Sequence, residues 1–278
     1  MKQEIKYSIL VVCLNSGQRL LDTIETIINQ KYQNYEIVIK DGESTDGSIE
    51  QVRSRFVQKM EKIRIISCKD SSIYDAMNQA CTYATGDYYL FLNTGDSFYD
   101  AYVLEKITSG IIEKQKEFGE CPDIVYGNMY HKALGNIIYA APQMNDFTCY
   151  RNVPCHQTCF YHKSMFAERG YEPKYNVRAD YEHFLWCFYK KRARICYLPI
   201  MTASYEGGGY SETKEHKKQS ARQHREITEH YMGKGKVLKF RLIMLMTLAP
   251  LRSILAENKY FSGVYNGLKT MIYKLRKY

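Results

Sequence analysis

Short runs of apolar residues alternate, over the first third of the chain, with stretches in which apolar residues recur every three or four positions. The runs cover residues 9–14, 35–39, 63–66 and 88–92, and their length and continuity predict strands that are buried on both faces. The helical spacing between them is carried by Leu20, Leu21, Ile24, Ile27 and Ile28, then by Ile49, Val52 and Phe56, and then by Ile73, Ala76, Met77 and Ala80. Strands that alternate with helices predict parallel βαβ units with right-handed crossovers.

The pattern is less regular in the rest of the chain. Residues 123–128 predict a further strand, residues 136–139 a short edge strand, and residues 153–161 an extended segment. A helix is predicted to open at Arg178–Tyr181, and residues 214–231 are polar enough to predict a solvent-exposed helix. The sequence therefore predicts an α/β protein that ends in helices.

Length and charge suggest a division of the 278 residues into a domain over residues 1–212 and a helical appendage over residues 213–278. Residues 231–278 hold ten of the 39 Lys and Arg residues and a single acid, Glu257, so this tail carries the whole net charge of +9. The neutral body argues against a nucleic-acid groove across the domain. The basic tail is typical of a segment that meets an anionic surface.

The tail also has an amphipathic pattern, in which apolar residues recur at helical spacing between basic ones: Phe261, Val264, Leu268, Met271, Ile272 and Leu275. This predicts a helix in the membrane interface; the alternative is packing on the domain or on a second subunit. No uncharged apolar run is long enough to predict a span, and the polar residues 1–6 predict no secretory leader. We therefore expect a cytoplasmic protein, attached peripherally to the inner face of the cell membrane, with its nine cysteines as free thiols.

Carboxylates follow two of the predicted strands. Asp41 comes after the strand at 35–39 and Asp96 after the strand at 88–92, each beside a turn that contains glycine. Ligands of open α/β sheets bind beyond the carboxyl ends of the strands, and a hard oxygen ligand suits Mg²⁺ or Mn²⁺ carrying a phosphate. The alternative for Asp96 is a cap on a helix that starts near Ser97. The glycine motifs of dinucleotide-binding and P-loop proteins are absent.

A structural zinc site must also be considered, because three cysteines and two histidines fall within fourteen residues: Cys149, Cys155, His156, Cys159 and His162. No C-x₂-C pair occurs among them, and the alternation of side chains along a strand would divide the ligands between its two faces. We therefore expect no zinc there.

Three motifs, in order along the chain, resemble the family 2 glycosyltransferases. They are D-G-E-S-T-D-G-S at 41–48, D-S-S-I-Y-D-A-M-N at 70–78 and F-L-N-T-G-D at 91–96. The similarity extends over roughly residues 7–210 and is closest to the branch that builds capsular polysaccharide and colanic acid. It implies a GT-A fold, with a mostly parallel central sheet flanked by helices. It also implies a nucleotide-diphosphate sugar as donor, with UDP-sugars expected first, a divalent ion, Mn²⁺ or Mg²⁺, and inversion at the anomeric carbon.

The resemblance also implies a donor site, formed by Asp41, Asp70, Asn78, Asn93 and Asp96. Asp41 matches the carboxylate that contacts the base and the ribose, and Asp96 matches the last Asp of the metal-binding D-x-D motif. Asn93 and Gly95 occupy positions where the family often has Asp, and Lys40 stands where many members carry another Asp. The metal would therefore rest on one carboxylate, together with donor phosphates and water.

On the acceptor side, the resemblance implies that His156 and Gln157 face the acceptor and that Asp180 is the general base. An acceptor hydroxyl is a weak nucleophile and must lose its proton as it attacks. From the residues alone, Asp180 is better interpreted as an acid in the first turn of a helix, where the helix dipole favours it. The expected acceptor is a saccharide, with a polyprenyl-diphosphate-linked one as the candidate at a membrane.

Two alternatives from other classes remain open. A sugar-phosphate nucleotidyltransferase shares the mononucleotide-binding scaffold, but it normally has a Gly-rich, Arg-containing loop after the first strand, and residues 14–18 lack it. A non-catalytic, membrane-bound scaffold would keep the fold without turnover, and the absence of Asp at positions 93 and 95 is compatible with it.

Overall fold

The computed structural model describes residues 4–207 and 214–247. Within these residues the strands are β1 (Tyr7–Cys13), β2 (Tyr35–Asp41), β3 (Ile63–Ser67), β4 (Tyr88–Phe91), β5 (Ser97–Phe98), β6 (Ile124–His131), β7 (Asn136–Ile138), β8 (Cys159–His162) and β9 (Ile195–Tyr205). The helices are α1 (Gln18–Ile28), α2 (Ser48–Arg55), α3 (Ile73–Cys81), α4 (Val103–Phe118), α5 (Asp146–Arg151), α6 (Ser164–Ala167), α7 (Ala179–Tyr189), α8 (Lys214–Met232) and α9 (Lys234–Met246), with the 3₁₀ helices η1 (Val57–Lys62) and η2 (His156–Thr158). The chain divides into two compact units, residues 1–224 and 225–278.

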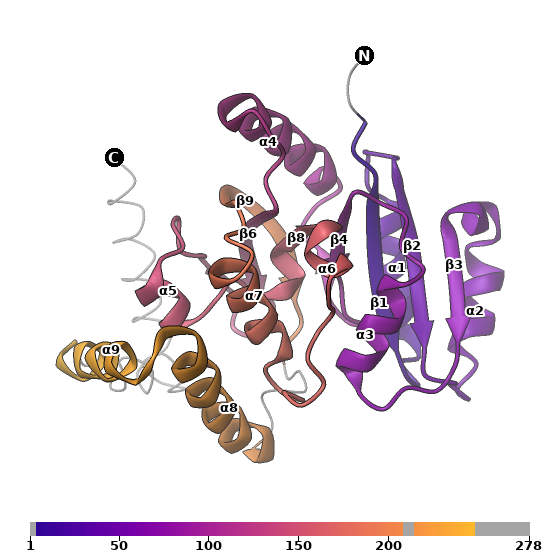
Figure 1. The fold of residues 1–278 in the computed structure, drawn as a ribbon. Helices are drawn as coiled ribbons and strands as arrows, with labels where there is room; N and C mark the ends of the chain where they lie inside the picture. Colours follow the sequence, from indigo (N-terminus) through magenta and orange to yellow (C-terminus); the bar gives the residue numbers. More distant parts are fainter. Residues whose placement is uncertain (1–3, 208–213, 248–278) are drawn as a thin grey trace. The chain divides into compact units, whose positions relative to one another are not determined.

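The strands form one sheet in the order β3-β2-β1-β4-β8-β6-β9-β5, with β7 paired to β6 (Figure 1). The first four strands are parallel to one another, as the alternation of strands and helices predicts. Beyond β4 the sheet is mixed, because β8 runs antiparallel to both of its neighbours and β5 runs antiparallel to β9. The carboxyl ends of β1, β2 and β4 therefore meet at one edge of the sheet.

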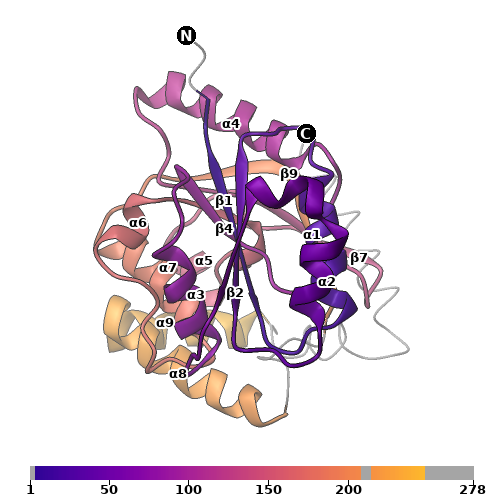
Figure 2. The same cartoon turned by 90° about the vertical axis from the view of Figure 1, so that its right-hand side faces the viewer.

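Helices cover both faces of the parallel half. β1, β2 and β4 are buried almost throughout, whereas the edge strand β3 is partly exposed. Figure 2 shows α1 and α2 on one side of the strands and α3, α6 and α7 on the other. On the first side, Ile9 and Val11 of β1 join one hydrophobic core with Leu20 and Ile24 of α1 and Ile107 of α4. This two-sided burial is the physical reason why β1 and β4 contain unbroken apolar runs in the sequence.

The structure differs from the sequence predictions at two places beside the strand edge. Ser97–Phe98 is the short strand β5, and the next helix starts only at Val103, so the interpretation of Asp96 as a helix cap is wrong. The predicted extended segment at 153–161 is a strand only from Cys159 onward. Residues 156–158 form η2, which packs against β4.

The second unit begins within α8 and includes α9. Four large apolar side chains of α9 are exposed: Leu238, Leu242, Leu245 and Met246. None of the helices within residues 4–207 and 214–247 is long and apolar enough to cross a membrane. The amphipathic pattern predicted at 261–275 lies outside the described residues.

His183 of α7 lies in the core of the first unit, with no exposed surface. Its ring stacks on Phe166 at 4.3 Å and on Trp186 at 5.5 Å between centroids. Burial lowers the pKa of His183 to about 3, and the positive charge of Arg169 acts in the same direction. The fold therefore requires this histidine to be neutral.

Acidification should consequently destabilise the protein through His183. The folded pKa of about 3 lies below the ordinary value of about 6.5, so the unfolded chain takes up the proton first as the pH falls. The contribution to stability is complete above about pH 6.5 and is lost towards pH 3, by up to about 1.4 kcal/mol per pH unit. His183→Phe keeps a ring between the two aromatic neighbours and should flatten the pH dependence of the urea-unfolding free energy in this range. An unchanged slope would contradict the assignment.

Candidate active site

Asp96 lies directly beyond β4 and is only 4% exposed. Its Oδ2 accepts a hydrogen bond from Gln157 Nε2 at 2.8 Å, and its Oδ1 accepts one from the backbone N–H of Glu206 at 3.0 Å. Burial raises the pKa of the Asp96 carboxyl group, although both hydrogen bonds oppose the shift. Buried carboxylates are usually paired with a positive charge or coordinate a metal ion, and both of these donors are uncharged.

Gly95, beside Asp96, has a backbone conformation that disfavours an aspartate at this position. Its φ of +95° is a conformation that residues with a side chain rarely adopt. A Cβ at this position would also overlap with the side chains of Arg19 and Glu206, which form an ion pair at 2.5 Å. An Asp at position 95 would not fit this arrangement.

Asp180 lies in the first turn of α7, but its partners come from other elements as well. Oδ1 accepts hydrogen bonds from the hydroxyl of Tyr74 at 2.9 Å and from the backbone N–H of Tyr181 at 2.8 Å. Oδ2 lies 3.1 Å from Nδ1 of His156, and 27% of the Asp180 side chain is exposed. Burial alone would raise the pKa of Asp180, but the hydrogen bonds from His156, the backbone of Tyr181 and the hydroxyl of Tyr74 lower it. The result is an ionised carboxylate with an accessible surface, which a general base requires.

The turn η2 joins the two carboxylates. Gln157 donates to Asp96, and its neighbour His156 contacts both Asp180 and Asn93, with 3.1 Å between His156 Nε2 and Asn93 Nδ2. The structure thus brings together five predicted site residues from three separate parts of the chain. The acceptor-facing role of His156 and Gln157 stays a prediction.

Asp41 ends β2 and is 2% exposed. Its Oδ1 accepts hydrogen bonds from the backbone N–H of Ser44 at 3.1 Å and from its hydroxyl at 2.5 Å. The loops after β1 and β2 are tied to each other, since Asn15 bonds Ser44 and Thr45, and Asp46 accepts from the backbone N–H of Gly17 at 2.8 Å. The sequence did not predict these contacts between the two loops, although the motif at 41–48 includes the loop after β2.

Asp70 pairs with Lys40, the residue that departs from the family pattern. Lys40 has no exposed surface, and its Nζ lies 2.8 Å from Asp70 Oδ2 and 2.6 Å from the backbone oxygen of Cys68. A fully buried ammonium group needs such compensation. Asp70 therefore has a partner of opposite charge in Lys40. A contact between Asp70 and the donor stays a prediction.

The side-chain amide of Asn78, in α3, makes two hydrogen bonds with the backbone of Tyr171. Nδ2 donates to the carbonyl oxygen at 2.9 Å, and Oδ1 accepts from the N–H at 2.7 Å. Gly170 leaves room for this amide, since a Cβ there would overlap with it. These bonds fix the segment before α7 to α3. A donor contact by Asn78 stays a prediction.

All nine cysteines are free, as expected from the composition. Within the part of the chain that the structure describes, no three His, Cys, Asp or Glu side chains group closely enough to hold a metal ion. Both ring nitrogens of His156 have partners in the site described above. Among the described residues, a divalent ion at this place would therefore meet one carboxylate, that of Asp96.

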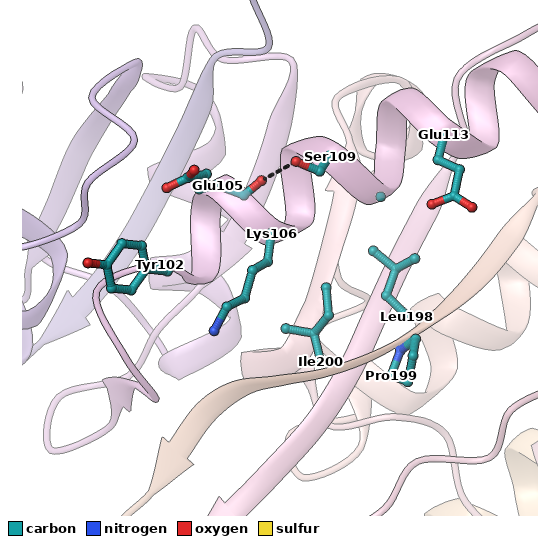
Figure 3. A pocket seen from close by; sticks show the side chains of 9 residues that line it. Tyr102, Glu105, Lys106, Ser109, Glu113, Leu198, Pro199 and Ile200 are labelled. Atoms are coloured by element: carbon teal, nitrogen blue, oxygen red, sulfur yellow. Dashed lines mark hydrogen bonds between the residues drawn. The ribbon is translucent and has the colours of Figure 1, made fainter. Parts of the chain in front are cut away.

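A surface cavity of about 430 Å³ lies between α4 and β9 (Figure 3). It is lined by Tyr102, Glu105, Lys106, Ser109, Gly110, Glu113, Leu198, Pro199 and Ile200. None of the predicted site residues lines this cavity, and the hydroxyl of Ser109 donates to the backbone oxygen of Glu105 at 3.0 Å. The cavity is thus separate from the candidate active site.

Comparison with known proteins identifies the family. Residues 8–170 match the model described as "Glycosyl transferase family 2". The chain belongs to this family. It is 31% identical over 210 residues to the PGL/p-HBAD biosynthesis glycosyltransferase of Mycobacterium bovis (strain BCG / Pasteur 1173P2). These aligned residues cover 74% of this chain and 79% of the relative. It is also 23% identical over 142 residues to the amylovoran biosynthesis glycosyltransferase AmsB of Erwinia amylovora, covering 50% of this chain and 46% of AmsB.

Solved structures share the fold of this family 2 glycosyltransferase. S. aureus TarS, residues 1–349, superposes with a TM-score of 0.65 at 15% identity, covering 92% of this chain and 76% of TarS. The mannosyltransferase PcManGT from Pyrobaculum calidifontis, solved in complex with GDP-Man and Mn²⁺, superposes with a TM-score of 0.61 at 12% identity, covering 97% of this chain and 88% of PcManGT. The expected GT-A fold with a helical C-terminal segment is confirmed.

Membership in this family also helps to choose between the functions that the sequence left open. Membership in a glycosyltransferase family favours sugar transfer over nucleotidyl transfer. The capsular and colanic acid branch stays a prediction.

Proposed function

We propose that this protein is an inverting glycosyltransferase that moves a sugar from a nucleotide-diphosphate sugar to a saccharide acceptor in the synthesis of a surface polysaccharide or glycolipid. The observation that carries the proposal is the pair of carboxylates, Asp96 and Asp180, joined by His156 and Gln157. One carboxylate is buried and suited to a cation. The other is ionised and accessible, and suited to accept a proton. The names of the relatives, which refer to PGL/p-HBAD and amylovoran biosynthesis, support the class of product.

In this proposal each carboxylate has a separate task. Asp41, at the end of β2, binds the nucleoside, and Asp180 takes the proton of the acceptor hydroxyl as that oxygen forms its bond to the anomeric carbon. The bond from that carbon to the diphosphate breaks on the opposite face, so the configuration inverts in a single displacement. One displacement needs only one base, and the site offers one in Asp180.

The donor set at Asp96 fits Mg²⁺ or Mn²⁺. Both are hard ions, and Mg²⁺ commonly binds through one or two carboxylates together with substrate phosphates and water. A single buried Asp96 carboxylate, held by the Gln157 amide and the backbone N–H of Glu206, matches that requirement. When bound, the ion would neutralise charge on the leaving diphosphate. The Mn²⁺ in the PcManGT complex supports this choice of ion.

A nucleotide-sugar screen tests the proposed function. UDP- and GDP-sugars are added to the full-length protein with Mn²⁺, and the melting temperature is measured. A ligand at 100 times its Kd should stabilise the folded state by about 2.7 kcal/mol. The best ligand is then incubated alone and with saccharide acceptors, and release of the nucleotide diphosphate is followed. Binding without any release would favour the non-catalytic scaffold.

We also propose that the protein attaches to the cytoplasmic face of a membrane, where a polyprenyl-diphosphate-linked acceptor would lie. The basic tail supports this, since each Lys or Arg near an anionic leaflet contributes about 1 kcal/mol. The exposed Leu238, Leu242, Leu245 and Met246 on α9 add apolar area next to Lys239 and Arg241. Attachment would bring a soluble donor and a membrane-bound acceptor to one enzyme.

The full-length protein should co-sediment with anionic liposomes at low salt and should dissociate only in part at high salt, because the apolar contribution is not screened. Replacing both Leu242 and Leu245 by Ser should release it at high salt. Leu134→Ser is the matched control, because Leu134 and Leu245 are each 54% exposed and Leu134 lies between β6 and β7. Failure of the wild type to co-sediment at low salt would assign the tail to packing or to oligomer formation.

A further inference from the structure

His156 has a partner at each ring nitrogen. Nδ1 lies 3.1 Å from Asp180 Oδ2, and Nε2 lies 3.1 Å from the side-chain amide nitrogen of Asn93. The ring is 13% exposed, so water replaces neither contact easily. The two partners come from α7 and from the end of β4, and the histidine therefore connects the base to the donor edge of the sheet.

The two contacts together select one form of the ring. An ionised Asp180 only accepts hydrogen bonds, so Nδ1 of His156 must carry a proton. In a neutral ring Nε2 is then an acceptor and needs a donor, and the NH₂ group of Asn93 is the donor at that place. Turning the Asn93 amide round would set its oxygen against the lone pair of Nε2 unless the ring became a cation.

An aspartate at position 93 would have the opposite effect. It offers only acceptors, so the ring between it and Asp180 would bind a proton at both nitrogens. Asp180 would then be paired with a full positive charge, which stabilises its ionised form and makes it a weaker base. Other titratable or charged groups around the pair are Asp96, Cys155, Tyr74, Tyr171 and Arg178.

We propose that His156 is the positioning residue of the base Asp180 and that Asn93 keeps it neutral, so that Asp180 is oriented by a hydrogen bond without being paired to a cation. The inference rests on the proposed transfer reaction, because it concerns the base of that reaction. Asn93 Oδ1 is buried and has no hydrogen-bond partner among the described residues. The amide thus uses its NH₂ group on the histidine and keeps an acceptor for a ligand at the donor edge.

The first test reads the ring directly and needs no activity. The full-length protein is labelled with ¹⁵N-histidine, and the signals of His156, one of seven histidines, are identified by their loss in His156→Asn. At neutral pH the wild type should show a protonated Nδ1 and a bare Nε2. Asn93→Asp should protonate both nitrogens. Asn93→Leu, which removes the donor at similar size, should leave Nδ1 protonated, because Asp180 still accepts its hydrogen bond. A protonated Nε2 in the wild type, or an unchanged spectrum in Asn93→Asp, would overturn the proposal.

The second test uses the pH dependence of kcat for transfer, in which the acid limb reports the ionisation of the base. Asn93→Asp should lower kcat by about tenfold and move the acid limb to lower pH. His156→Phe keeps a ring but loses both nitrogens; it should lower kcat by about 10- to 100-fold and move the acid limb to higher pH. His156→Asn places an N–H donor at the position of Nδ1 and should recover part of the loss. His162→Gln, six residues further on and bonded to Ser164, is the control and should leave kcat and the limb unchanged.

Failure of the proposed function and failure of the role proposed for His156 would give different results. Normal transfer by Asp180→Asn would refute the proposed function at its base. An inactive Asp180→Asn, together with an unmoved acid limb in both Asn93→Asp and His156→Phe, would refute only the role of the histidine, because a merely structural residue changes stability and leaves the limb in place.

Discussion

Asp180→Asn should lower the turnover of sugar transfer by about 10²–10⁴-fold, which is the usual contribution of a general base. The substitution keeps the size and shape of the side chain but removes its ability to take a proton. The contacts with Tyr74, Tyr181 and His156 involve one side-chain oxygen or the other, so an amide retains at least part of them and the fold should persist. Donor affinity, measured by calorimetry with a nucleotide-sugar, should not change.

The control for this prediction addresses the alternative in which Asp180 only complements the helix dipole. Glu105 is an acid in the first turn of α4 and lines the surface cavity that is separate from the candidate active site. Glu105→Gln should remove a dipole contribution of about 0.3–1 kcal/mol and leave turnover unchanged. If Asp180→Asn behaves in the same way, with normal donor binding and near-normal transfer, Asp180 is not the base.

The parallel half of the fold was predictable because burial on both faces leaves a direct trace in the sequence. β1, β2, β3 and β4 all appear as apolar runs, and Asp41 and Asp96 follow two of them. The antiparallel pairing of β8 leaves no comparable trace, since which edge a strand joins depends on tertiary packing rather than on periodicity. The mixed character of the sheet beyond β4 therefore had to come from the structure.

The candidate site was predictable as a set of residues but not as a set of contacts. Asp96 and Asp180 were identified separately, by strand position and by resemblance. Their connection through η2 depends on a 3₁₀ turn of three residues, His156–Thr158, which apolar spacing cannot reveal. The same holds for the ion pair of Lys40 with Asp70, in which an apparent departure from the family pattern is a buried charge with its own partner.

Asp96→Asn should abolish the gain in nucleotide-diphosphate binding that Mn²⁺ provides. The amide keeps the volume of the carboxylate and one acceptor oxygen, but it cannot offer a negative charge to a divalent ion. Both oxygens of Asp96 accept a hydrogen bond, one from Gln157 and one from the backbone N–H of Glu206, and the amide can replace only one of them. Its NH₂ group faces a donor at the other position, so the melting temperature of the variant should fall, with a cost of about 1–3 kcal/mol.

Calorimetry with UDP or GDP, with and without Mn²⁺, measures this effect on the full-length protein. In the wild type Mn²⁺ should tighten binding, and each tenfold gain corresponds to about 1.4 kcal/mol. In Asp96→Asn the two titrations should coincide, because the nucleoside contacts around Asp41 remain while the only protein carboxylate proposed for the ion is gone. Asp100→Asn is the matched control, since Asp100 follows four residues later and pairs with Lys106 at 2.7 Å, and it should keep the full gain. A comparable gain in Asp96→Asn would show that the ion is held elsewhere and that the buried carboxylate serves only to anchor Gln157 and the backbone of Glu206.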